Sequence, residues 1–201
     1  MKNLVILGAG TAGTMMANHL VKKLNKKDWQ ITLVDQFKSH YYQPGFLFIP
    51  FGTYQPEDVK RTIDEFLPKG IQLIREKIDR IDKDTDTVIL ENGRNVKYDI
   101  LIIATGCKIA PEEVPGMKGD TWQKNIFDFY TFEGSCALAK KLETWPGGKL
   151  VVHITEMPIK CPVAPLEFAF LADDYFTKKG MRHKVEISYV TPLSGAFTKE
   201  K

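Results

Sequence analysis

Three glycines near the start of the chain have the spacing of a dinucleotide-binding loop. Gly8, Gly10 and Gly13 form the pattern G-x-G-x-x-G. The first glycine of such a loop permits a tight turn, the second lets the backbone approach a pyrophosphate, and the third allows close packing of helix on strand. Asp35 follows at the distance of about 20 residues where a carboxylate binds a ribose 2′-hydroxyl. These residues predict a dinucleotide site that disfavours a 2′-phosphate, and hence NADP.

A second turn between a strand and a helix has a different composition. Residues 156–165 read Glu-Met-Pro-Ile-Lys-Cys-Pro-Val-Ala-Pro and contain no glycine. Proline removes an N–H donor and fixes φ, so a second phosphate-binding loop is not expected here. Cys161 lies beside Lys160 and just before a predicted helix N-terminus, and both neighbours favour a thiolate. The turn therefore predicts a reactive thiol, with a structural cysteine as the alternative interpretation.

Hydrophobic patterning places the glycine loop in a parallel β-α-β unit. Strands are predicted at residues 3–7 and 30–34, with a helix at 14–24 between them. Residues 71–98 contain short strand-like runs, and the Asn92-Gly93 pair signals a hairpin turn, which predicts a small β-meander. A buried parallel strand is predicted at residues 99–104.

A second unit of the same type is predicted near the end of the chain. It has strands at residues 149–155 and 185–190 around a long helix at 164–179. Further helices are predicted at 56–67 and 131–142. The fold class is therefore α/β, a doubly wound parallel sheet with Rossmann-like domains at residues 1–110 and 111–201. Two parallel strands cannot cover both faces of a sheet, so the second domain is expected to be truncated.

The composition disfavours several classes of function. A net charge of +3 and a hydrophobic share of 43% suit an ordinary globular domain. Basic and acidic residues are interleaved, which argues against nucleic-acid binding. No apolar run reaches the roughly 20 residues that span a bilayer, and no signal peptide is seen, so a cytoplasmic location is expected. The three cysteines, at irregular spacing, predict neither a disulfide framework nor a metal site.

Residues 98–106 read Tyr-Asp-Ile-Leu-Ile-Ile-Ala-Thr-Gly. Preceded by a β-meander, this segment resembles the second flavin-contact motif of the pyridine nucleotide-disulfide oxidoreductase superfamily, and the resemblance covers almost the whole chain. It implies that the first domain binds FAD. The predicted cofactor-binding residues are Gly8, Gly10, Thr11, Ala12, Gly13, Asp35, Gln43, Ile78, Ala104, Thr105 and Gly106.

Two further segments are similar to the sulfide:quinone oxidoreductase family. They are residues 160–168, Lys-Cys-Pro-Val-Ala-Pro-Leu-Glu-Phe, and residues 42–44, Tyr-Gln-Pro. The resemblance implies that Cys161 is catalytic and that sulfide adds to a disulfide or polysulfide joining Cys161 to a second cysteine. It also implies that FAD passes two electrons to a membrane quinone and that sulfur leaves as polysulfide.

The chain departs from that family's pattern in one place and leaves another unchecked. Phe127 and Asp128 stand where many members carry an accessory cysteine. The partner cysteine of the family lies beyond the position of Lys201, so residues 1–201 alone are expected to be inactive. For the whole protein the resemblance implies peripheral binding to the inner face of a membrane and allows a homo-oligomer.

Three other functions remain open. A type II NADH:quinone reductase needs a glycine loop near residue 158, which this sequence lacks. The flavoprotein subunit of a flavocytochrome-type sulfide dehydrogenase is usually exported, so the missing signal peptide counts against it. A non-catalytic flavin-binding module is also possible, although Cys161 between lysine and proline at a helix start argues against it.

Overall fold

A computed structural model describes residues 1–196, and the chain divides into two compact units that are treated separately below. Unit 1 comprises Met1–Tyr42 and Val59–Lys108, whereas unit 2 comprises Gln43–Asp58 and the residues from Ile109 onward. The predicted domains at residues 1–110 and 111–201 stay a prediction. The grouping of Gln43–Asp58 with the second unit was not predicted, because it depends on packing between segments far apart in the sequence.

Unit 1 is built on a four-stranded parallel sheet with the order β5-β2-β1-β9. Helix α1 (Thr11–Lys23) connects β1 to β2 and begins three residues earlier than predicted. The strands are β1 (Lys2–Leu7), β2 (Trp29–Val34), β5 (Ile71–Ile74) and β9 (Ile100–Ile103). The predicted α/β class with a parallel sheet is confirmed.

An antiparallel three-stranded meander follows β5. Its strands are β6 (Ile78–Asp82), β7 (Thr87–Leu90) and β8 (Asn95–Lys97). The predicted hairpin turn is confirmed, because Gly93 has a φ of +84° and its N–H donates to the Leu90 carbonyl. The predicted meander was too long at its start, since β5 pairs in parallel with β2 and belongs to the main sheet.

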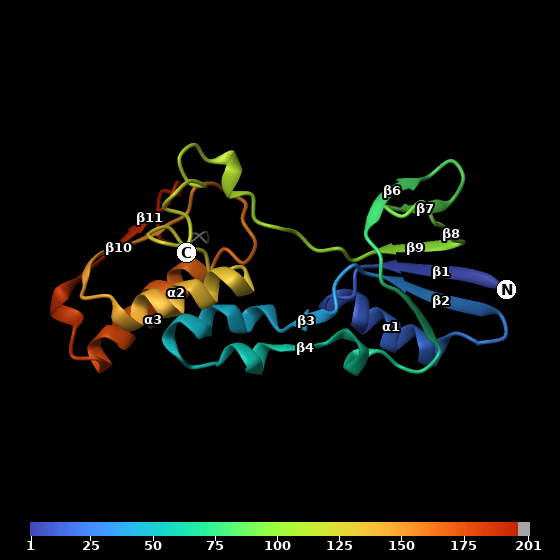
Figure 1. Cartoon of the computed structure of the whole chain (residues 1–201), viewed down its shortest axis with the longest axis horizontal. Helices are drawn as coiled ribbons and strands as arrows, with labels where there is room; N and C mark the ends of the chain where they lie inside the picture. The colour runs from blue at the N-terminus through green and yellow to red at the C-terminus, as the bar shows by residue number, and fades with distance from the viewer. Residues whose placement is uncertain (197–201) are drawn as a thin grey trace. The chain divides into compact units, whose positions relative to one another are not determined.

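Strand β1 is buried on both faces because α1 covers one side of the sheet and the meander covers the other (Figure 1). Leu4 and Ile6 pack in the cluster that contains Ala17 of α1. Val5 and Leu7, which alternate with them, pack in the cluster that contains residues of β7. Burial of each such side chain stabilises the fold by about 1.5–3 kcal/mol. The strand therefore holds the first residue of the glycine loop in place.

Strand β9 was predicted to be buried, and this was wrong for part of its surface. Ile100 is 43% exposed and Ile103 is 64% exposed. The strand lies at the edge of the sheet and pairs only with β1 among the described strands. An apolar run of this length cannot show whether a strand is central or at an edge, because that depends on strand order.

The predicted helix at residues 56–67 was also wrong. Three short elements occupy this segment: η2 (Pro56–Val59), β4 (Lys60–Thr62) and η3 (Ile63–Phe66). Val59 and Ile63 are buried four residues apart, which imitates the spacing of a helix face. Strand β4 instead pairs with β3 (Ser39–Tyr41).

Unit 2 contains a parallel two-stranded sheet and two α-helices. Its strands are β10 (Gly148–His153) and β11 (Val185–Val190), and its helices are α2 (Phe132–Thr144) and α3 (Ala164–Lys178). These four elements agree with the predicted ones to within two residues at each end. The described part of the unit also includes the 3-10 helices η1 (Gln43–Phe51), η4 (Pro111–Glu113) and η5 (Arg182–Lys184).

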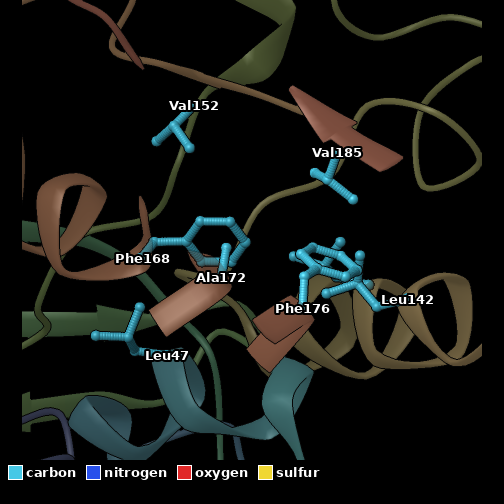
Figure 2. Packing of buried hydrophobic residues seen from close by; sticks show 8 residues of the cluster. Leu47, Leu142, Val152, Phe168, Ala172, Phe176 and Val185 are labelled. Carbon is cyan, nitrogen blue, oxygen red and sulfur yellow. The ribbon is translucent and has the colours of Figure 1, made fainter. Parts of the chain in front are cut away.

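The core of unit 2 lies between α3, α2 and η1. Phe168, Ala172 and Phe176 recur every four residues and form the buried stripe of α3. Figure 2 shows this stripe surrounded by side chains from the other elements, which are Leu47, Leu142, Val152 and Val185. Leu47 belongs to η1, so apolar packing accounts for the position of Gln43–Asp58 in this unit. None of the helices described in residues 1–196 is long and apolar enough to cross a bilayer.

Candidate functional site

The glycine loop leaves β1 through a backbone conformation that requires glycine. Gly8 has a φ of +95°, and its N–H donates to the Val34 carbonyl at 2.8 Å. A Cβ on Gly8 would lie 2.4 Å from the Ala104 oxygen. A Cβ on Gly13 would lie 1.8 Å from the Gly8 oxygen. Both glycines are therefore required by the protein's own packing.

Gly10 differs from its two neighbours because the space beside it is open. A Cβ placed on Gly10 would meet no atom within 4 Å. Gly10 is also the N-cap of α1, where no side chain accepts a hydrogen bond and the first turn contains no acidic residue. A helix N-terminus of this kind presents N–H donors and partial positive charge to an anion. The open space and the uncapped helix fit the pyrophosphate of a dinucleotide.

Asp35 supports the loop from the end of β2. Its Oδ2 accepts a hydrogen bond from the Ala9 N–H at 2.6 Å, and its Oδ1 accepts one from the Phe37 N–H at 2.7 Å. The carboxylate thus fixes the peptide between the first two glycines of the motif. Its predicted contact with a ribose hydroxyl stays a prediction.

His40 is a residue of this site that the sequence did not indicate. Its Nδ1 lies 3.1 Å from the Ala9 oxygen, and because a carbonyl can only accept, Nδ1 must carry the proton. The imidazole packs on Phe66, with ring centroids 4.4 Å apart. The backbone of Ala9 is therefore held at its N–H by Asp35 and at its carbonyl by His40. No motif links these positions.

The turn after β9 lies beside the glycine loop. The Ala104 N–H donates to the Leu7 oxygen at 2.8 Å, which places residues 104–106 next to the end of β1. Thr105 and Gly106 are exposed, and Gly106 has a φ of +71°. Thr11 and Ala12 are also exposed at the start of α1. The carboxyl ends of β1 and β9 thus bring two of the predicted segments together.

Two of the predicted cofactor-binding residues make no described contact with the glycine loop. Ile78 is half-buried and packs in the apolar cluster with Val88 and Leu90, between the sheet and the meander. Gln43 belongs to unit 2, where its Oε1 accepts a hydrogen bond from the Lys160 ammonium. Their predicted role in binding the cofactor stays a prediction.

The second candidate segment, residues 154–163, joins β10 to α3. It contains no glycine, and its Met157–Pro158 peptide bond is cis. Cys161 has an exposed side chain and a φ of +50°. This left-handed conformation costs a residue with a Cβ about 1–2 kcal/mol. The cysteine precedes Ala164, the first residue of α3, so its predicted position just before a helix is confirmed.

Hydrogen bonds hold Lys160 and Cys161 within this segment. The Tyr130 hydroxyl donates to the Cys161 carbonyl at 3.1 Å, and the Ala164 N–H donates to the same oxygen at 3.1 Å. The Lys160 ammonium donates to Gln43. Burial, and to a lesser extent the neighbouring Cys161, raises the pKa of Tyr130 well above its usual range. Its hydroxyl therefore remains a donor at any ordinary pH. Tyr130 is a second residue that sequence spacing did not indicate.

The other two cysteines occupy different surroundings. Cys107 is exposed, and Cys136 of α2 is half-buried. At the position of the missing accessory thiol, Phe127 packs against the core of unit 2. The Asp128 carboxylate accepts hydrogen bonds from the Tyr130 and Thr131 N–H groups.

Comparison with known proteins gives three findings. The family model described as "Pyridine nucleotide-disulphide oxidoreductase" matches residues 2–152. A sulfide-quinone reductase of Aquifex aeolicus is 31% identical over 200 residues, which are 98% of this chain and 45% of that protein. A type II NADH:quinone oxidoreductase of Staphylococcus aureus is 28% identical over 123 residues, which are 61% of this chain and 30% of that protein.

A solved structure agrees with the sequence relatives. The sulfide:quinone oxidoreductase from Aquifex aeolicus matches with a TM-score of 0.78 and 28% identity, covering 94% of this chain and 43% of that one. The chain therefore spans less than half the length of these relatives.

Proposed function

The chain belongs to the pyridine nucleotide-disulphide oxidoreductase family, and from this premise we propose that the whole protein oxidises sulfide and reduces a quinone. Proteins of this family and its sulfide:quinone relatives are FAD-binding flavoproteins, which confirms the predicted cofactor. The finer assignment, to sulfide and quinone, is a proposal that rests on the relatives and on one loop of unit 2.

The residues around the end of β1 would hold FAD. Gly10 and the N-terminus of α1 would receive the pyrophosphate, since this is where the protein leaves open space and unoccupied donors. Asp35 and His40 would keep the loop in shape through the backbone of Ala9. When bound, FAD supplies an acceptor for two electrons.

The segment at residues 154–163 is the observation that carries the proposal. An NADH site at this position would need a glycine loop whose backbone approaches a pyrophosphate. The protein has prolines and an exposed cysteine there instead, so the backbone offers fewer donors and the side chain offers sulfur chemistry. Electrons would then enter through a thiol.

The proposed reaction of Cys161 conserves atoms, charge and electrons. A Cys161 thiolate and a hydrosulfide ion would combine to a persulfide, with formation of one sulfur–sulfur bond and release of one proton and two electrons, for which bound FAD would be the acceptor. A further hydrosulfide or a second thiol would remove the outer sulfur atom and regenerate the thiolate. The exposed side chain of Cys161 gives both nucleophiles access.

A reduction experiment tests this proposal directly. The purified full-length flavoprotein is mixed anaerobically with sulfide in one cuvette and with NADH in another, and the flavin absorbance is followed. We expect sulfide to bleach the flavin and NADH to leave it oxidised. In Cys161→Ser the bleaching by sulfide should be lost, because the hydroxyl cannot form a persulfide.

Cys107→Ser is the matched control, since Cys107 is also an exposed thiol. This variant should be bleached by sulfide as fast as the unaltered protein. Loss of bleaching in Cys107→Ser but not in Cys161→Ser would assign the reaction with sulfide to Cys107. That result would refute the proposed role of Cys161.

The similarity to the Staphylococcus aureus enzyme supports one second candidate, a type II NADH:quinone reductase. It predicts that NADH bleaches the flavin and that Cys161→Ser has no effect. The glycine-free loop is the reason to rank it second, and the two cuvettes separate the two functions.

A further inference from the structure

Cys161 has a backbone conformation that is sterically unfavourable for a residue with a Cβ atom. Its φ of +50° lies in the left-handed region, where glycine is the usual residue and where asparagine or aspartate is sometimes found. Such a conformation persists in a residue with a Cβ only when the surrounding structure imposes it. The contacts that impose it also determine where the thiol points, since Cα–Cβ follows the backbone.

One of these contacts comes from a residue distant in the sequence. Tyr130 donates its hydroxyl hydrogen to the Cys161 carbonyl at 3.1 Å. The Ala164 N–H donates to the same oxygen, also at 3.1 Å. Two donors on one carbonyl fix the orientation of the peptide that follows Cys161. The Ala164 bond belongs to the start of α3, so Tyr130 is the donor that comes from outside the segment.

Tyr130 is itself held rigidly. Its ring stacks on Phe129 at a centroid distance of 5.1 Å, and Phe129 stacks on Phe168 of the core at 4.7 Å with an interplanar angle of 9°. The backbone of Tyr130 is fixed as well, because its N–H donates to the Asp128 carboxylate at 3.0 Å. The hydroxyl thus projects from a stack of rings that is continuous with the core of unit 2.

We propose that Tyr130 is the positioning residue for Cys161, which it holds in the left-handed conformation so that the thiol keeps one direction. The inference rests on the proposed redox role of Cys161. Burial keeps the Tyr130 hydroxyl protonated by raising its pKa, so it acts as a fixed donor and takes no part in proton transfer. Its effect on the reaction passes entirely through the cysteine.

Tyr130→Phe tests this role, because it removes the hydroxyl and retains the stacked ring. Tyr175→Phe is the control, since the Tyr175 ring also packs in the core of unit 2 and its hydroxyl makes no hydrogen bond within the described residues. Amide hydrogen exchange of the full-length flavoprotein reports on the segment without any need for activity. The Ala164 amide should exchange about fivefold faster in Tyr130→Phe, as expected for one lost hydrogen bond.

Steady-state kinetics provide the readout that a merely structural role would not change. In Tyr130→Phe we expect kcat with sulfide to fall about tenfold, while the KM for quinone stays within about twofold and the flavin content is unchanged. Tyr175→Phe should match the unaltered protein in both measurements.

The outcomes separate this inference from the proposed function. Faster exchange together with the drop in kcat supports the positioning role. Faster exchange in a protein whose unaltered form does not oxidise sulfide supports the anchor at Tyr130 and overturns the proposed function. Exchange in Tyr130→Phe equal to that of Tyr175→Phe, or a kcat that does not change while sulfide is oxidised, overturns the positioning role.

Discussion

Residues 8–10 join β1 to α1, and residues 154–163 join β10 to α3, so both segments lead from a parallel strand into a helix. Each contains one residue with a positive φ, which is Gly8 in the first and Cys161 in the second. In the first loop the left-handed position is filled by the residue that adopts it at no steric cost. In the second it is filled by a residue that must be held there.

The difference shows how one topology can serve two kinds of chemistry. Gly10 leaves open space at the start of α1, and no side chain caps that helix, so the backbone is free to bind a ligand. In the second loop the prolines reduce the number of backbone donors, and in the proposed function the exposed Cys161 would provide the reactive group. The first loop is suited to binding through the backbone, and the second to reaction through a side chain.

The largest expected effect tests the glycine loop. Gly13→Ala should lower the free energy of unfolding by about 2–3 kcal/mol, because the added Cβ overlaps the Gly8 oxygen. It should also abolish measurable FAD binding. Gly10→Ala should change stability by less than about 1 kcal/mol, since it only replaces a glycine N-cap, yet weaken FAD binding at least about tenfold. Urea unfolding of the apoprotein and titration with FAD measure both quantities.

Equal FAD affinity in Gly10→Ala and the unaltered protein would mean that FAD does not occupy the open space beside Gly10. In that case the contrast between the two loops would lose its functional meaning, although the packing requirement at Gly13 would stand.

A medium effect is expected at the left-handed position of the second loop. Cys161→Gly should be more stable than Cys161→Ala by about 1 kcal/mol, because alanine keeps the left-handed cost and glycine does not. The greater chain entropy of glycine in the unfolded state reduces this gain. Both variants lack the thiol, so their unfolding midpoints in urea compare the backbone alone. An alanine variant as stable as the glycine variant would show that the segment is not strained at Cys161.

The smallest effect concerns Asp128, which supports Tyr130. Burial raises the pKa of this carboxyl above its usual value, against the opposing effect of hydrogen bonds from Thr131 and Tyr130. A raised pKa in the folded state means that the contribution of Asp128 to stability is full below about pH 4 and is lost as the pH rises through the folded value. Asp128→Asn does not titrate, so the stability of the unaltered protein relative to this variant should decrease between pH 3.5 and 7.

We expect that decrease to stay below about 1 kcal/mol, because the carboxyl is partly exposed to water. Urea unfolding of both proteins at the two pH values measures it, and the other carboxyls cancel in the difference. A relative stability that increases with pH would mean that the hydrogen bonds outweigh burial.

Local patterns in the sequence determined much of this protein. The glycine spacing and the apolar run before it predicted the first β-α-β unit, because both depend on contacts between near neighbours. Asp35 was identified by its separation from the glycine motif. The Asn92-Gly93 turn, the helices at 132–144 and 164–178 and the place of Cys161 before a helix were predicted for the same reason. The cofactor followed from a family resemblance rather than from physics alone.

Only the tertiary structure decided the rest. Strand order placed β9 at an edge and moved β5 into the parallel sheet, and pairing with β3 replaced a predicted helix by β4. His40 contacts the glycine loop and Tyr130 contacts Cys161 across 31 residues of chain in each case. Such contacts depend on where whole elements pack, and no spacing within a single element records them.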